Sequence, residues 1–282
     1  MSFLANAKKP AVRPPMITIV GTPGTGKTTL GALFPGAVIM PTEDGTAVFE
    51  NWADDVQPDV LPRVPKAQLD GAGNMARSSR QTVLAMLDEL MTADHPYQTL
   101  VIDSITTLAG MLEAEISLRD GVGTVGEAAG GFHRGYTEVA SWHAELIYKC
   151  EQLRAVKGMA IVFLAHTGIK KIRNRPDAAA DYSVFSLDMD GQALSAYVAQ
   201  SDAVLYLTKE EFVSGSETNK RGQTTKFGRV QQTGRRTLIT TGDGKIGYVN
   251  AKNRYGMPAE LEVPHGENPI TQYIKFYSQQ GE

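Results

Sequence analysis

The sequence predicts an α/β fold, in which a mostly parallel central sheet carries helices on both faces and is followed by a β-rich C-terminal extension. Three observations support this prediction. Four short runs are continuously apolar rather than alternating, as in strands that are buried on both faces. Stretches with helical spacing separate these runs. After about residue 202 the pattern changes to strands and turns without a long helix between them.

The predicted elements of the core alternate along the chain. Buried strands are expected at residues 16–20, 37–40, 99–102 and 159–165. Helices are expected from Lys27, over residues 78–91, from the end of the third strand to about Arg119, and over residues 135–156. The Pro- and Asp-rich residues 54–73 are expected to form a surface loop, and the glycine-rich residues 120–131 to be irregular.

The last third of the chain has a different pattern. Strands are predicted at residues 203–207, 237–240 and 246–249, and the polar, basic residues 214–236 favour a hairpin. Asn268 and Pro269 suit the N-cap and first position of a short final helix. The predicted organisation is an N-terminal arm at residues 1–15, a core at residues 16–258 and a tail at residues 259–282.

Composition narrows the class of protein. The 282 residues are 42% hydrophobic and 21% charged, which is typical of a globular protein with one main core. The net charge of −3 gives no overall basic footprint, so a polyanion would have to bind local patches. The single cysteine, Cys150, excludes an internal disulfide, and no apolar run has the length of a membrane helix. We expect a cytoplasmic protein with no membrane partner and with Cys150 in the core.

A glycine-rich motif between the first strand and the next helix predicts a nucleotide site. The glycines allow a tight turn whose backbone N–H groups surround phosphates, and the helix N-terminus favours anions. Lys27 is expected to reach the β- and γ-phosphates, and the Thr28 hydroxyl to ligate Mg²⁺. The sequence therefore predicts binding of ATP with Mg²⁺. The motif comprises Gly21, Thr22, Pro23, Gly24, Thr25, Gly26, Lys27, Thr28 and Thr29.

Acidic residues at two strand ends extend the predicted site. Asp103 closes the run 99–102, where a Walker-B aspartate would hold Mg²⁺ through water; an aspartate here can also simply cap the next helix. Glu43 and Asp44 follow the second strand, where a carboxylate can orient or deprotonate the water that attacks ATP. From spacing alone, a plain Glu-Asp-Gly surface turn is an equally good interpretation.

The order of these motifs resembles that of the RecA-like ATPases, and most closely the phage-encoded single-strand annealing proteins of the Sak group. The resemblance runs from about residue 16 to 258 and is strongest in GTPGTGKTT, Met40-Pro41-Thr42-Glu43, TLVIDSIT and MAIVFLAH. It implies a RecA-like P-loop core with DNA-stimulated ATPase activity, acting in the cytoplasm of a bacterial host if the protein is phage-encoded. It also favours Glu43 over Asp44 as the catalytic carboxylate.

The resemblance implies catalytic roles for His166 and for a basic pair. RecA-like proteins carry a polar γ-phosphate sensor after the strand that follows Walker B, where RecA has glutamine and this chain has His166. The stretch Lys252-Asn253-Arg254-Tyr255-Gly256 is similar to KNRFG of RadA-type proteins and to the cation pair of DnaB-type helicases. In those families the cations reach the nucleotide of the neighbouring subunit, which implies a homo-oligomer, either ring or filament. A structural histidine and a solvated turn are the alternatives.

Two basic stretches follow the third and fourth strands, where RecA-like cores bind single-stranded DNA. Cations there can follow a DNA backbone, and neighbouring aromatic side chains can stack on bases. Residues 220–236 add cations without an acidic residue, either as another DNA contact or as a balance to the acidic remainder. The candidate DNA-binding residues are Arg119 and Arg134 in residues 119–134, and Lys170, Lys171, Arg173 and Arg175 in residues 167–190.

The main hypothesis is an ATP-dependent recombination protein that binds single-stranded DNA and anneals or pairs strands. It places ATP between subunits and adds a single-strand DNA-binding protein as a further partner. Three alternatives stay open. They are a DNA-translocating ATPase of the DnaB or RadA type, a nucleotide-dependent binding module with little turnover, and a regulatory RecA-like ATPase that acts on proteins.

Overall fold

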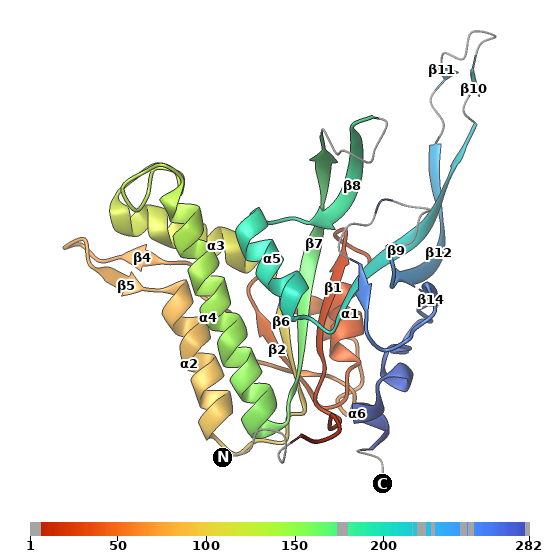
Figure 1. Ribbon diagram of the computed structural model, residues 1–282, viewed down its shortest axis with the longest axis horizontal. Helices are drawn as coiled ribbons and strands as arrows, with labels where there is room; N and C mark the ends of the chain where they lie inside the picture. Colours follow the sequence, from red (N-terminus) through yellow and green to blue (C-terminus); the bar gives the residue numbers. More distant parts are fainter. Residues whose placement is uncertain are drawn as a thin grey trace.

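The computed structural model contains a ten-stranded sheet (Figure 1). It describes residues 7–173, 180–215, 217–218, 224–226, 229–242, 247 and 251–279. Strand β13 (Lys252–Asn253) pairs with β9 (Ala203–Ser214), and β8 (Tyr182–Leu187) pairs with β7 (Ala160–Ile172). The main path of the sheet is β14 (Glu260–Glu262), β12 (Arg229–Ile239), β9 (Ala203–Ser214), β1 (Met16–Gly21), β7 (Ala160–Ile172), β6 (Thr99–Asp103), β2 (Ala37–Pro41) and β3 (Asp59–Val60).

The neighbouring strands β9, β1, β7, β6, β2 and β3 are all parallel. The ends of these strands therefore form two distinct edges of the sheet. We call the edge where these strands end the carboxyl edge, and the edge where they begin the amino edge. Strand β1 begins with Met16 at the amino edge and ends with Gly21 at the carboxyl edge. At the usual rise per residue, the two edges are therefore roughly 17 Å apart along β1.

Helices cover both faces of the sheet, as the continuous apolar strands predict. In β1, Met16 and Val20 join the core under one helical layer, whereas Ile17 and Ile19 join the core on the opposite face. The first layer consists of α2 (Ser79–Thr92), α3 (Ile105–Asp120), α4 (Arg134–Lys157) and α5 (Gly191–Gln200). The second consists of α1 (Lys27–Ala32), η2 (Thr46–Phe49) and the C-terminal η3 (Thr271–Tyr273) and α6 (Lys275–Ser278).

The predicted β-rich extension is confirmed. Strands β9 and β12 form a long antiparallel hairpin, and the small strands β10 (Glu217–Thr218) and β11 (Thr224–Lys226) pair between them. In the predicted tail, β14 pairs with β12, and Ile270 and Ile274 are buried in the core. The boundary at residue 258 stays a prediction. The strand predicted at residues 246–249 lies outside the described residues, apart from Gly247.

Two expectations about local structure were wrong, and one helix was not predicted. Residues 54–73 contain β3, which extends the sheet beside β2, and β4 (Gln68–Leu69), which pairs with β5 (Met75–Arg77). The basic stretch after the fourth predicted strand is not a plain loop, because β7 continues to Ile172 and its residues 167–172 pair with β8. Helix α5 had no predicted counterpart, because no element was predicted for residues 191–200.

Two expectations from composition concern the core and the membrane. Cys150 lies buried in α4, as predicted, and burial raises the pKa of its thiol. Among the described helices, none combines the length and the apolar character needed to cross a bilayer.

Candidate functional site

The glycine-rich motif lies at the carboxyl edge, between the end of β1 and the start of α1. Gly24 and Gly26 adopt left-handed backbone conformations, with φ of 76° and 91°, which residues other than glycine rarely adopt. Thr25 fastens the turn, because its backbone N–H and its hydroxyl both donate to the Thr22 carbonyl, at 3.3 and 2.9 Å. Apart from the two chain neighbours of Gly24, no described residue has an atom within 4 Å of the place that a Cβ on Gly24 would take. The loop therefore has an open backbone surface of the kind that surrounds phosphates.

Lys27 is the first residue of α1, and its ammonium folds back onto the loop. Its Nζ donates to the carbonyls of Gly21 and Thr22, at 2.9 and 3.2 Å. Burial lowers the pKa of Lys27, whereas the carboxylates of Asp103 and Glu43 act in the opposite direction. A phosphate in the loop would take over the hydrogen bonds that the ammonium now gives to these carbonyls.

Thr28 and Asp103 come together from two different elements. The Thr28 hydroxyl in α1 donates to Asp103 Oδ2 at the end of β6, at 2.6 Å. Burial raises the pKa of Asp103, and the nearby charge of Glu43 adds to this, whereas the hydrogen bond from Thr28 lowers it. A hydroxyl and a carboxylate are the hard oxygen ligands that Mg²⁺ prefers, so these two residues fit a magnesium ion beside the phosphates.

Glu43 lies next to this pair, just after β2. Its carboxylate contacts His166 Nε2 at 3.3 Å and accepts a hydrogen bond from the Thr107 hydroxyl at 3.2 Å. The hydrogen bond with His166 lowers the pKa of Glu43, against the effect of partial burial. Asp44, the alternative carboxylate, is exposed. The geometry therefore favours Glu43 as the group that can act on a water molecule.

A set of hydrogen bonds that the sequence did not reveal holds these strand ends together. The Thr42 hydroxyl donates to the Ser104 carbonyl and accepts from the Ser104 N–H, at 2.9 and 2.8 Å. The Thr42 N–H donates to the Asp103 carbonyl at 2.7 Å. Thr42 thereby fixes Glu43 beside Asp103. In the sequence, Thr42 precedes Glu43 and Ser104 follows Asp103, which is the pattern that could have indicated these hydrogen bonds. Their pairing could not be predicted, because it depends on how β2 and β6 align.

His166 links the nucleotide site to the basic hairpin. It lies in β7 opposite Gly21 of β1, and its N–H donates to the Thr106 hydroxyl at 2.9 Å. Its Nε2 faces Glu43, and its buried Nδ1 has no hydrogen-bond partner among the described residues. Six residues further along the same strand, β7 ends at Ile172, within the basic hairpin.

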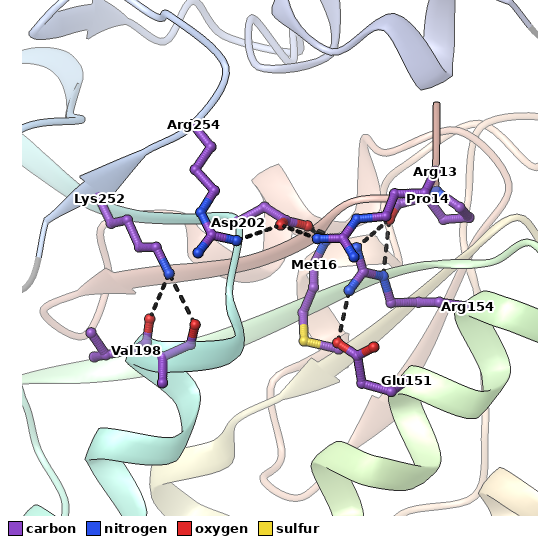
Figure 2. Close-up of polar contacts among 10 residues, drawn as sticks. Arg13, Pro14, Met16, Glu151, Arg154, Val198, Asp202, Lys252 and Arg254 are labelled. Carbon is purple, nitrogen blue, oxygen red and sulfur yellow. Dashed lines mark hydrogen bonds and ion pairs between the residues drawn. The ribbon is translucent and has the colours of Figure 1, made fainter. Parts of the chain in front are cut away.

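Lys252 and Arg254 lie far from this site, at the amino edge (Figure 2). Arg254 Nη1 contacts Asp202 Oδ1 at 3.2 Å, and the Asp202 N–H donates to the carbonyl of Met16, the first residue of β1. Lys252 Nζ donates to the carbonyls of Val198 and Ala199 at 3.0 Å each. Since the phosphate loop follows the other end of β1, these two cations do not join the nucleotide site of their own chain.

At the amino edge, the carboxylate of Asp202 contacts more than one positively charged side chain. Besides Arg254, its carboxylate contacts the guanidinium groups of Arg13 at 3.1 Å and Arg154 at 2.7 Å. Arg154 is buried, whereas the side chains of Arg13 and Arg254 are 62% and 52% exposed. Glu151 is a second carboxylate in contact with Arg154, at 3.0 Å, so the amino edge presents two exposed guanidinium groups around the carboxylate of Asp202 (Figure 2).

The candidate DNA-binding stretches both project beyond the carboxyl edge. Figure 1 shows the turn between α3 and α4 and the paired strands β7 and β8 on the same side of the sheet as β10 and β11. Lys170, Lys171 and Arg173 are exposed on the β7–β8 hairpin, and Arg175 lies outside the described residues.

In the other stretch, Arg119 and Arg134 differ in their availability. Arg119 is held by Glu138, at 2.5 and 3.0 Å, and by Asp120 at 2.7 Å, so it would have to exchange these partners for a phosphate. Arg134 is exposed at the start of α4. Phe132, which precedes it by two positions, is 91% exposed with a left-handed backbone. The stretch therefore offers an exposed aromatic ring two positions before an exposed arginine.

Comparison with known families agrees with this geometry. The profile of the AAA domain family matches residues 13–255, which include the phosphate loop, Asp103 and the strands of the parallel sheet. No curated protein sequence matches the chain. The match covers well over half of the chain and indicates nucleotide-dependent ATPase activity. The chain therefore belongs to the AAA domain family of P-loop ATPases.

Proposed function

We propose that this P-loop ATPase is an ATP-dependent, single-stranded DNA-binding recombination protein that promotes annealing or pairing of strands. The observation that carries the proposal is the continuity of β7. The middle of this strand places His166 against Glu43 in the nucleotide site, and its C-terminal part carries the exposed Lys170 and Lys171. A change at the nucleotide can thus reach a basic surface through one strand.

The chemistry of hydrolysis follows from the groups around the loop. Glu43 orients the attacking water and accepts its proton as the water oxygen bonds to the γ-phosphorus, while the bond from this phosphorus to the β–γ bridging oxygen breaks and ADP leaves. Lys27 and the loop N–H groups hold the phosphate oxygens, and Thr28 and Asp103 would hold a Mg²⁺ ion that would screen the charge of these oxygens. Departure of the γ-phosphate changes the contact between His166 and Glu43. Strand β7 then carries this change to the part of the strand that pairs with β8.

We further propose that ATP binds between subunits, with Lys252 and Arg254 of one subunit facing the phosphates held by the next. Two features support this. The exposed guanidinium groups at the amino edge exceed the single carboxylate that holds them. The phosphate loop at the carboxyl edge combines one ammonium with the carboxylates of Asp103 and Glu43. Head-to-tail stacking brings these opposite charges together, and a cation supplied in this way stabilises the transferred phosphoryl group.

The first test measures ATP hydrolysis and DNA binding together. Turnover should rise with single-stranded DNA and with protein concentration. Replacing Lys170 and Lys171 by alanine should weaken DNA binding and lower the salt dependence of log K by roughly 0.7 per lost phosphate contact. The matched control replaces Lys8 and Lys9, an adjacent pair of exposed lysines just before β1. Turnover indifferent to DNA at low salt would remove the recombination proposal and leave an ATPase with another client.

A mixing experiment tests the subunit interface. Glu43→Gln and Arg254→Ala variants should each hydrolyse ATP poorly by themselves. In an equimolar mixture, some interfaces combine the intact Glu43 of one subunit with the intact Arg254 of its neighbour, so turnover should recover in part. A mixture no more active than its components, although both variants assemble, would exclude a role for Arg254 in trans.

A further inference from the structure

A second cation of the same chain lies on the phosphate loop, although the motif does not include it. Arg236 belongs to β12, two strands away from β1, and its side chain is half-buried. Its Nη1 lies 2.7 Å from the place that a Cβ on Gly26 would take, and its Cδ and Cζ lie 3.9 Å from it. The guanidinium thus rests directly against the residue that precedes Lys27.

The local backbone aims Arg236 at the loop. Strand β12 is irregular between Gln232 and Arg236, and Gly234 within this segment has a left-handed φ of 84°. Such irregularities bend a strand and redirect its side chains. The position is then fixed, because the Arg236 carbonyl accepts from the Val263 N–H at 2.9 Å and Nη2 donates to the Pro264 carbonyl at 3.0 Å.

The neighbouring arginine provides a contrast at nearly the same place in the chain. Arg235 points to Glu262 of β14, with Nη2 at 3.0 Å from its carboxylate, and the Arg235 side chain is 61% exposed. Successive residues of a strand face opposite sides, so the two arginines cannot serve the same surface. Only Arg236 of this pair reaches the loop.

The charges around the loop favour a second cation beside a bound nucleotide. A polyphosphate bound there lies near the carboxylates of Asp103 and Glu43, which already attract the ammonium of Lys27. A guanidinium presents a planar fork of N–H donors that matches phosphate oxygens, and it keeps its charge when partly buried. The N–H groups of the loop face the α- and β-phosphates, so a group resting on Gly26 is close to these two phosphates.

We propose that Arg236 binds the α- or β-phosphate of the nucleotide held by its own subunit. The inference rests on the nucleotide binding in the proposed function, and it assigns Arg236 to the nucleotide rather than to DNA. Arg236 is then a binding residue supplied in cis from the β-rich extension, in addition to the cations proposed to act in trans from the amino edge. It also gives the extension a direct link to the state of the nucleotide.

Equilibrium binding tests the proposal without relying on turnover. Dissociation constants of ATP and ADP with Mg²⁺ would be measured by titration calorimetry for the wild type and for Arg236→Ala, Arg236→Lys and Arg235→Ala. Loss of a charge-assisted hydrogen bond to phosphate should weaken both nucleotides by roughly tenfold or more in Arg236→Ala. Arg236→Lys should recover part of this loss, and Arg235→Ala should bind like the wild type.

The outcomes separate this proposal from the one on which it rests. Unchanged or tighter binding by Arg236→Ala, or an equal loss in Arg235→Ala, would overturn the role of Arg236 while leaving nucleotide binding intact. A wild type that binds ATP no better than Lys27→Ala would overturn both. Thermal unfolding without nucleotide shows whether each variant is folded, and Arg236→Lys keeps the test valid if the alanine variant is not.

Discussion

The two edges of the parallel sheet arrange their charged groups differently. At the carboxyl edge, the ammonium of Lys27 faces two carboxylates, Asp103 and Glu43. At the amino edge, the carboxylate of Asp202 faces three guanidinium groups. Both arrangements are hydrogen-bonded and partly buried, so neither is an ordinary solvated surface. In the proposed head-to-tail assembly, the exposed guanidinium of Arg254 would meet the polyphosphate that the next subunit binds beside these two carboxylates.

The pKa shifts express the same contrast. Burial raises the pKa of Asp103, and Glu43 adds to the rise. Burial also acts to raise the pKa of Asp202, but the hydrogen bond from the Met16 N–H and the charges of Arg154 and Arg13 outweigh it, so the pKa is lowered. A carboxylate at the carboxyl edge therefore gains most from an added cation, whereas Asp202 is already compensated.

The largest expected effect comes from the carboxyl edge. Glu43→Gln keeps the size and most of the hydrogen bonding of the side chain but removes its ability to accept a proton. Turnover should fall by roughly a hundredfold to a thousandfold. ATP binding should change little. Steady-state hydrolysis and nucleotide titration measure the two quantities, and the exposed neighbour provides the control variant Asp44→Asn. Equal turnover in both variants would favour a binding module that hardly hydrolyses ATP.

The next effect concerns the stability of the amino edge. Asp202→Ala leaves the buried guanidinium of Arg154 and the Met16 N–H without this acceptor. Removing one partner of a buried ion pair should lower the free energy of unfolding by about 3 kcal/mol. Urea unfolding measures the loss. The control is Glu151→Ala, which removes a more exposed partner of the same arginine. Equal losses in the two variants would show that Asp202 is not the centre of this cluster.

A pH effect should arise in the helical layer rather than at either edge. His143 is fully buried, its Nδ1 is paired with the Tyr197 hydroxyl at 2.7 Å, and burial lowers its pKa from 6.5 to about 4. The unfolded chain binds the proton first, so stability is lost as pH falls below 6.5 and stops falling below about 4. Between pH 7 and 5 this histidine should cost about 2 kcal/mol of unfolding free energy.

The double variant His143→Leu with Tyr197→Phe separates this effect from the edges. It removes the titrating group together with the hydroxyl that would be left unpaired. Urea unfolding at pH 7 and pH 5 should then differ less than in the wild type. The lowered pKa of Asp202 acts in the same direction, but only below the ordinary aspartate pKa of about 3.9. An unchanged difference between the two pH values would place the acid-sensitive group elsewhere.

The smallest expected effect is that of Arg254→Ala on stability. The side chain is half exposed, and its contact with Asp202 adds to two other guanidinium contacts. Surface ion pairs of this kind contribute less than about 1 kcal/mol. Urea unfolding should therefore give nearly the wild-type value, so that a loss of turnover in this variant reports on function. A loss as large as that of Asp202→Ala would make Arg254 a structural residue.

The sequence by itself determined the local features that depend on residue type and order. Continuous apolar runs predicted the buried parallel strands, and the glycine-rich loop with Lys27 and Thr28 predicted the phosphate site. Strand ends also placed Asp103 and Glu43 at one edge, because parallel strands end together. The extent of β7 was missed, since the exposed part of a hairpin is stabilised by pairing with β8 rather than by apolar residues.

Only the tertiary structure decided which distant residues meet. Thr42 and Ser104 join β2 to β6, and His166 meets Glu43 across the sheet, through contacts that depend on strand register. Arg236 reaches Gly26 because of an irregularity in β12, which has no fixed sequence signature. The separation of Lys252 and Arg254 from the phosphate loop follows from the direction of β1. Local patterns fix the elements, whereas long-range packing fixes the partners of each polar side chain.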